Sequence, residues 1–169
     1  MLHKAYAFNW LAFESDELSG LIVQALETDD SSGLFRYIED RHNCLKDPYF
    51  GNPLNEYWLE MLENRDVQEY ADFALTCFYD TAQDWGIGDR WIEIDELLFE
   101  SDQSALLGFS IGPVGKLFDP GGMGSYFQTP KQVLQSLVVV CNLNIPSIAI
   151  FRELLEMSSQ QGFGIYVTF

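Results

Sequence analysis

Basic residues are scarce in this sequence. Only 9 lysines and arginines stand against 26 aspartates and glutamates, so the formal net charge is −17. A charge of this sign repels nucleic acids and anionic membrane surfaces, and it attracts cationic molecules. We therefore expect a protein that binds neither nucleic acid nor membrane. The alternative is that the surplus charge only keeps the protein in solution, without a specific partner.

Cysteine and histidine are also rare. The three cysteines, Cys44, Cys77 and Cys141, form no Cys-x-x-Cys pair and are odd in number, which argues against a disulfide framework or a structural zinc site. The two histidines, His3 and His42, lie near no cysteine pair, and the acidic residues form no EF-hand loop. The sequence predicts buried free thiols in a reducing cytosol, with no metal and no cofactor.

The sequence has no long apolar run. No segment approaches the roughly 18 apolar residues that a membrane-spanning helix needs. The first residues, MLHKAYAFNWLAF, contain one lysine and a short apolar stretch interrupted by Asn9, without the small-residue cleavage site of a signal peptide. Asn-x-Ser/Thr sequons are also missing. We expect a cytoplasmic protein.

Apolar and aromatic residues are well represented, at 47% and 15% of the chain. A chain of 169 residues is long enough for one domain with a sizeable core, so we expect a single domain over residues 1–169. The charge is unevenly distributed, because residues 1–102 hold 23 acids and 6 bases whereas residues 103–169 hold 3 of each. The prediction is an acidic N-terminal part and a neutral C-terminal part.

Helical spacing of apolar residues dominates the acidic part. The patterns predict helices over 18–26, 34–41, 54–63 and 67–82. Asp66 and Glu69 resemble a capping box in front of the last of these helices, and Gly86 is expected to end it.

Strand patterns dominate the neutral part. Strands are expected over 104–111, 114–118, 125–128 and 163–169 in this part, and over 5–13 and 91–99 in the acidic part, although residues 91–99 also fit a short helix. Thr129-Pro130-Lys131-Gln132 predicts the start of a helix, and a further helix should begin near Pro146 and end at Gly162. We expect an α+β fold with a mostly antiparallel sheet of about four to five strands and roughly six helices, in which the first and last strands pair.

Residues 108–116 (GFSIGPVGK) loosely match two catalytic patterns. The Gly108-x-Ser110-x-Gly112 run has the form of a hydrolase nucleophile elbow, but no helical stripe follows Ser110 and both histidines precede it, contrary to the order in that fold. The tail of a phosphate-binding loop is suggested by Lys116, yet Leu117 stands where a magnesium-binding Ser or Thr is required. We interpret both matches as accidental and expect no catalytic residue.

The helix over 67–82 and the loop after it predict a binding surface. Four acids should lie opposite the apolar stripe and face solvent, while the loop contributes two tryptophans and an arginine, residues that are common binding anchors. The alternative is that both tryptophans are buried in the core and Arg90 pairs with Asp89. The candidate binding residues are Glu69, Asp72, Asp80, Asp84, Trp85, Arg90 and Trp91.

These features favour a non-catalytic acidic protein-binding module over an enzyme. By functional analogy, immunity proteins and antitoxins present a negative face to a cationic toxin, and opposite potentials accelerate association. Two alternatives stay open. One is a small-molecule-binding domain or a small hydrolase that uses carboxylates, with its pocket near residues 118–127. The other is a homodimer joined through exposed aromatic residues.

Overall fold

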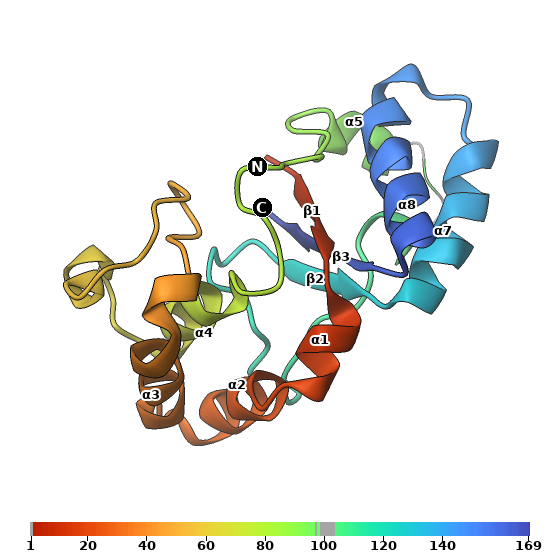
Figure 1. The fold of residues 1–169 in the computed structure, drawn as a ribbon. Helices are drawn as coiled ribbons and strands as arrows, with labels where there is room; N and C mark the ends of the chain where they lie inside the picture. Colours follow the sequence, from red (N-terminus) through yellow and green to blue (C-terminus); the bar gives the residue numbers. More distant parts are fainter. Residues whose placement is uncertain (1, 97, 99–103) are drawn as a thin grey trace. The chain divides into compact units, whose positions relative to one another are not determined.

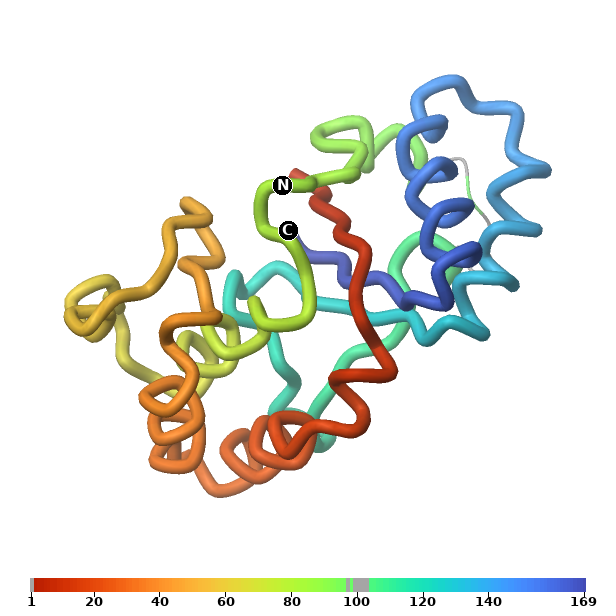
Figure 2. Tube along the Cα trace, in the orientation of Figure 1, coloured from red at the N-terminus to blue at the C-terminus, as the bar shows by residue number. Residues whose placement is uncertain are grey.

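The computed structural model describes residues 2–96, 98 and 104–169 (Figure 1). Contacts within the chain divide it into two compact units. Figure 2 traces the path of the chain. Unit 1 consists of residues 1–10, 83–110 and 121–169, and unit 2 consists of residues 11–82 and 111–120. The predicted α+β class is confirmed. A single domain over residues 1–169 stays a prediction.

Unit 1 contains a three-stranded antiparallel sheet. Its strands are β1 (Lys4–Phe8), β2 (Ser125–Gln128) and β3 (Gly164–Thr168), in the order β1-β3-β2. The predicted pairing of the first and last strands is confirmed, with Tyr6 opposite Tyr166. Phe127 lies opposite Tyr166 on the other side, and the two rings stack at 4.9 Å. Aromatic cross-strand neighbours of this kind stabilise a short sheet.

Two helices of unit 1, α7 (Pro130–Asn142) and α8 (Ala149–Gln161), pack against each other and against the sheet. The predicted start of α7 is confirmed, because Thr129 and Gln132 form a reciprocal capping box with Pro130 at the first helical position. The 3₁₀ helix η3 (Pro146–Ile148) leads into α8, which ends at the predicted Gly162 with a φ of 70°.

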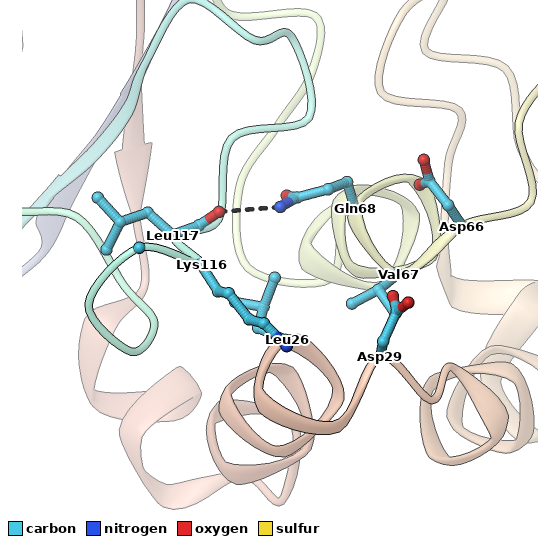
Figure 3. Close-up of a pocket in the computed structure, with 8 residues that line it drawn as sticks. Leu26, Asp29, Asp66, Val67, Gln68, Lys116 and Leu117 are labelled. Atoms are coloured by element: carbon cyan, nitrogen blue, oxygen red, sulfur yellow. Dashed lines mark hydrogen bonds between the residues drawn. The ribbon is translucent and has the colours of Figure 1, made fainter.

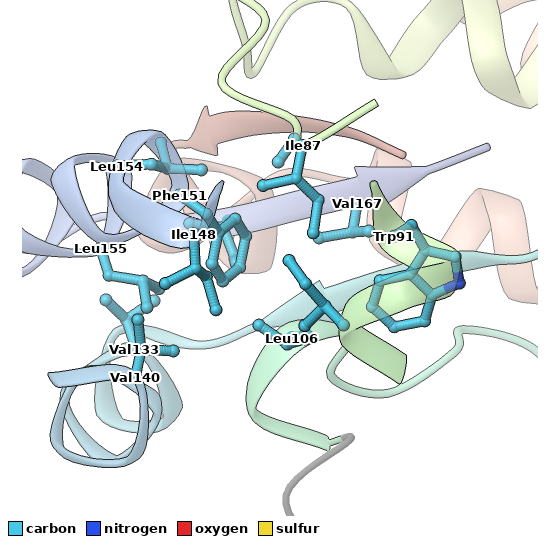
Figure 4. Close-up of a cluster of buried hydrophobic side chains, with 13 residues drawn as sticks. Ile87, Trp91, Leu106, Val133, Val140, Ile148, Phe151, Leu154, Leu155 and Val167 are labelled. Carbon is cyan, nitrogen blue, oxygen red and sulfur yellow. The ribbon is translucent and has the colours of Figure 1, made fainter. Parts of the chain in front are cut away.

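The core of unit 1 lies where these helices meet the sheet and α5 (Trp91–Asp95) (Figure 4). Each fully buried large aliphatic or aromatic side chain there contributes roughly 1.5–3 kcal/mol relative to exposure. The buried members are Ala5, Ile87, Trp91, Ile94, Leu106, Val133, Val140, Ile148, Phe151, Leu154, Leu155, Ile165 and Val167.

Unit 2 is built on α2 (Leu18–Thr28), α3 (Ser32–Arg41) and α4 (Val67–Leu75), which pack against one another pairwise. The short helices η1 (His42–Cys44) and η2 (Trp58–Met61) lie between α3 and α4 in the chain, and α1 (Trp10–Ser15) precedes α2. The Trp58 ring anchors η2, because it packs on Phe35 and Tyr70 with centroids 5.6 and 6.0 Å away.

Several predicted strands are wrong. The sheet has three strands in the described residues rather than four or five, and there are more than six helices. Trp91 and Ile94 are buried one helical turn apart, so the segment forms α5, the alternative to a strand. Residues 104–106 are helical, residues 114–118 form a turn and loop, and the first strand ends at Phe8. Residues 97 and 99–103 of these predictions lie outside the described residues.

Two predicted helices are also shorter than expected. Residues 54–63 form only the 3₁₀ helix η2. Helix α4 stops at Leu75, because the Thr76 hydroxyl donates to the carbonyl of Phe73 at 2.7 Å and closes the last turn. Gly86 therefore ends no helix. This position requires glycine for a different reason, because a Cβ on it would lie 2.0 Å from the carbonyl oxygen of His3.

In the described part of the chain, no helix has the length and apolarity needed to cross a membrane.

Candidate protein-binding surface

Unit 2 carries most of the negative charge of the chain. Its residues include 17 acids and 5 bases, a net charge of −12, whereas unit 1 has 9 acids and 4 bases, a net charge of −5. Twelve acids of unit 2 are exposed. Two of these form ion pairs within the unit, Glu17 with Arg41 at 3.0 Å and Asp80 with Lys46 at 3.1 Å. The acids so far outnumber the bases that such pairs leave the unit strongly negative.

A tight turn in unit 2 is organised by the carboxylate of Asp47. This side chain is buried, and its Oδ1 accepts hydrogen bonds from the backbone N–H groups of Tyr49 at 2.7 Å and Phe50 at 3.3 Å. The backbone of Asp47 also bonds to both later residues of the turn, accepting from Gly51 and donating to Asn52, each at 2.8 Å. These bonds fix the conformation of the turn.

The same turn exposes two aromatic side chains. Phe50 is 83% exposed and Tyr49 is 55% exposed, and Gly51 supplies the left-handed conformation the turn requires, with a φ of 70°. The Tyr49 ring still contacts Phe73, at 6.5 Å. Partial burial, followed by the charge of Asp72, raises the pKa of Tyr49 to about 12, so its hydroxyl is a neutral hydrogen-bond donor. A large apolar ring held in water on a fixed turn is suited to insertion into a partner.

A cavity of about 400 Å³ lies elsewhere in unit 2 (Figure 3). Two carboxylates line it: Asp29, which ends α2 in the left-handed conformation, and Asp66, whose side chain caps α4 by accepting from the N–H of Glu69 at 2.9 Å. The complete lining is Leu26, Asp29, Asp66, Val67, Gln68, Gly115, Lys116 and Leu117. Three apolar side chains, two carboxylates and the Lys116 ammonium share this lining, so the carboxylates outnumber the single cation.

Gln68 and Lys116 hold the loop that closes this cavity. The Gln68 amide donates to the carbonyl of Leu117 and accepts from the N–H of Asp119, both at 2.8 Å. The Lys116 ammonium donates to the carbonyl of Glu27 at 2.9 Å, near the carboxyl end of α2, where a cation is favourable. The residue that resembled the lysine of a phosphate-binding loop therefore fastens this loop to a helix.

The segment that resembles a nucleophile elbow has a different backbone. Phe109 exchanges two hydrogen bonds with Phe127, at 2.9 and 2.7 Å, as an isolated bridge. Gly108 has a φ of 106°, and a Cβ on it would lie 2.1 Å from the carbonyl oxygen of Phe127, so close backbone approach explains this glycine. Residues 111–120 form turns and loop without a helix. The helix that should follow an elbow serine is missing from this described segment.

Three predicted binding residues, Glu69, Asp72 and Trp91, are buried. The prediction that the two acids face solvent is wrong. Glu69 is 3% exposed and Asp72 is 5% exposed. The Glu69 carboxylate accepts hydrogen bonds from the backbone N–H groups of residues 63, 64 and 65, at 2.7, 2.8 and 2.6 Å. Its role is thus to stabilise that turn. Trp91 is buried and stacks on His3 at 5.4 Å, as the structural alternative proposed.

The other predicted residues are more accessible. Asp80, Asp84 and Arg90 are exposed, and Trp85 is half-buried. The Asp84 carboxylate accepts from the N–H groups of Ala5 at 3.1 Å and Gly86 at 2.8 Å, which ties its loop to β1. The seven residues do not share one helix. The structure assigns Glu69, Asp72 and Asp80 to unit 2, and Asp84, Trp85, Arg90 and Trp91 to unit 1.

The aromatic pair Tyr49 and Phe50 was missed by the sequence prediction, which placed no binding residue between the helices expected over 34–41 and 54–63. Two aromatic residues inside a proline- and glycine-bounded turn of the acidic part were the available signal.

The predicted burial of the cysteines is wrong, since all three are exposed free thiols. No cluster of three or more His, Cys, Asp or Glu side chains suited to a metal ion occurs in the described ranges.

Comparisons with protein-family models, curated proteins and solved structures gave no match for this chain. Its own residues are therefore the basis for a functional proposal.

Proposed function

We propose that this chain is a non-catalytic protein-binding module whose unit 2 docks against a basic protein partner. The observation that supports this most is the Asp47 turn, which holds Phe50 in solvent within a unit of net charge −12. Exposing a phenylalanine forgoes roughly 1.5–3 kcal/mol of burial free energy. A fixed, exposed aromatic ring is a typical binding hot spot.

The charge and the ring serve different steps of binding. The negative potential of unit 2 attracts a cationic partner over about 10 Å at ordinary ionic strength and raises the association rate. Insertion of Phe50 into an apolar pocket of the partner then slows dissociation, because most affinity differences lie in the dissociation rate. The carboxylates thus steer the partner toward unit 2, and the Phe50 ring anchors it there.

The cavity lined by Asp29 and Asp66 supports the same proposal. An arginine or lysine of the partner can pack its aliphatic stem on apolar walls such as Val67 and present its charged head to the two carboxylates. In this role Asp29 and Asp66 are the acids to test first, because Glu69 and Asp72 are buried.

Selection from a peptide library displayed on phage tests the proposal. The immobilised chain should enrich peptides that contain lysine or arginine together with apolar residues, and their affinity should fall as ionic strength rises. The matched variant is Asp29→Asn with Asp66→Asn, because asparagine also tolerates the left-handed end of α2 and caps α4. Glu153→Gln with Glu156→Gln in α8 is the control. Enrichment of peptides that lack basic residues would contradict the proposal. Equal peptide affinity of the Asp29→Asn with Asp66→Asn variant and the Glu153→Gln with Glu156→Gln control would also contradict it.

A small-molecule-binding domain or carboxylate hydrolase is the second candidate, because the same cavity has a size usual for small ligands. It reaches residues 115–117, next to the region 118–127 where the sequence placed a pocket. A thermal-shift screen of small organic cations distinguishes the two: stabilisation by such a compound that is lost in Asp29→Asn with Asp66→Asn, without any peptide binding, would favour this candidate.

A further inference from the structure

Helix α7 of unit 1 has an apolar stripe on its solvent side. Leu134 is 55% exposed, Val138 is 65% exposed and Cys141 is also exposed. Their spacing of four and three residues places them on one face of the helix. The opposite face, which includes Val133 and Val140, is buried in the core of unit 1. The stripe is therefore the solvent-exposed side of a helix whose other side packs in the core.

The stripe lies in the longest acid-free stretch of the sequence. Residues 120–152 contain no aspartate or glutamate, but they contain Lys131 and Arg152. A second copy of a chain with a net charge of −17 is repelled by most of the surface. Helix α7 lies wholly within that stretch and carries no carboxylate of its own, so contact through this helix brings no α7 carboxylates of the two copies together.

We propose that α7 packs against α7 of a second copy and forms a homodimer. A two-fold axis perpendicular to the helices places the same stripe on both sides of the interface and makes the two helices antiparallel, with Val138 near the axis. Lys131, at the amino end of one helix, then lies beside the carboxyl end of the other, where the helix dipole is negative. This charge complementarity supports a second copy as the molecule that covers the stripe.

The proposed interface is small. Two helices that meet through one face each bury less than the roughly 1,200–2,000 Å² of a stable complex. We therefore expect a dimer that dissociates on dilution. It needs neither the Phe50 turn nor the Asp29 cavity, so its presence or absence leaves the proposed binding of a basic partner unaffected.

Sedimentation velocity of the full chain over a wide concentration range tests the dimer. The unmodified chain should shift from monomer to dimer as concentration rises. Val138→Glu, which introduces two like charges near the axis, should remain monomeric at every concentration. Val114→Glu is the matched control, because Val114 is fully exposed in unit 2, and it should dimerise like the unmodified chain. A monomeric unmodified chain, or a Val138→Glu variant that dimerises normally, would overturn the proposal.

Cross-linking provides a readout that does not depend on folding of the charged variant. A short bis-maleimide should join two chains through Cys141, and Cys141→Ser should abolish the cross-linked dimer while Cys44→Ser and Cys77→Ser retain it. All three cysteines are exposed, so each can react. Cross-linked dimers that persist in Cys141→Ser would place the interface elsewhere and reject the α7 stripe.

Discussion

The carboxylate of Asp47 accepts a hydrogen bond from the backbone N–H of Tyr49 at 2.7 Å, and the side chain of Asp47 is buried while Tyr49 is exposed. A buried polar group thus fixes the backbone beneath an exposed aromatic pair. The conformational entropy of the turn is lost when the chain folds. Binding of Phe50 by a partner therefore carries no further entropic cost for ordering the turn.

Removal of this carboxylate should loosen the turn. We expect Asp47→Ala to lower the free energy of unfolding by about 1–3 kcal/mol, because it leaves the N–H groups of Tyr49 and Phe50 without their acceptor. Asp47→Asn keeps one acceptor oxygen and should lower it less. Urea unfolding followed by tryptophan fluorescence measures the difference, and equal stability of all three chains would show that the bonds to Asp47 contribute little.

Replacement of Phe50 should affect binding and leave stability intact. Because the ring is 83% exposed, Phe50→Ala should change the free energy of unfolding by less than about 0.5 kcal/mol. Its affinity for a selected basic peptide should fall about 10- to 100-fold, in the range of an anchor residue. Isothermal titration calorimetry measures the affinity, with Val114→Ala as an exposed apolar control. A Phe50→Ala variant that binds as tightly as Val114→Ala would remove Phe50 from the interface.

Gln68 should control the loop over residues 115–119. Its amide makes one donor and one acceptor bond to that loop, so Gln68→Ala should raise the hydrogen-exchange rate of the Asp119 N–H at least about tenfold, equivalent to about 1.4 kcal/mol. Gln68→Glu should show an intermediate effect, because a carboxylate accepts from Asp119 but cannot donate to Leu117. Hydrogen exchange followed by NMR provides the rates, with Gln160→Ala as the control. Unchanged exchange in Gln68→Ala would show that other contacts hold the loop.

His3 should make stability depend on pH. The ring packs against Trp91, Phe151 and Phe169, and burial lowers its pKa from 6.5 to about 4, against the opposing effects of the Leu106 backbone and the Asp84 charge. In the unfolded chain His3 binds a proton below about pH 6.5, whereas the folded chain binds it only below about pH 4. Stability should therefore fall as the pH drops through this window, by about 3 kcal/mol in total.

The matched variant for this window is His3→Phe, which keeps an aromatic ring and removes the titration. Carboxylates also titrate in the lower part of the window, so the quantity to compare is the difference between the two chains. Urea unfolding at intervals from pH 7 to about pH 4 should show this difference growing as the pH falls. Parallel stability curves for the two chains would show that His3 is protonated in the folded state as easily as in the unfolded state.

Local signals predicted part of the fold correctly. The capping residues Thr129 and Gln132 and the final Gly162 act within one helical turn, so the start of α7 and the end of α8 could be found from neighbouring residues. The pairing of β1 with β3 followed from two short apolar strands at the ends of the chain. The end of α4 depends on the Thr76 hydroxyl, which also bonds to the backbone of Lys46, 30 residues away, so spacing alone could not predict it.

The predicted site failed where burial depends on the whole unit. Helical spacing placed Glu69 and Asp72 on a solvent face, but α4 is enclosed by its neighbours and nearly all of its residues are buried. Composition likewise identified a surplus of aromatic residues without showing which are exposed. Trp91 is buried in unit 1, and Phe50 is exposed because of hydrogen bonds to Asp47, which only the folded turn shows.

Docking of a basic partner on unit 2 is tested most directly by the ionic-strength dependence of affinity for one selected peptide. Isothermal titration calorimetry should show affinity that falls steeply with added salt for the unmodified chain, and a flatter dependence for Asp29→Asn with Asp66→Asn. Phe50→Ala should bind more weakly at every ionic strength and keep the steep dependence. Affinity that is the same at low and high salt in the unmodified chain would contradict electrostatic docking through this unit.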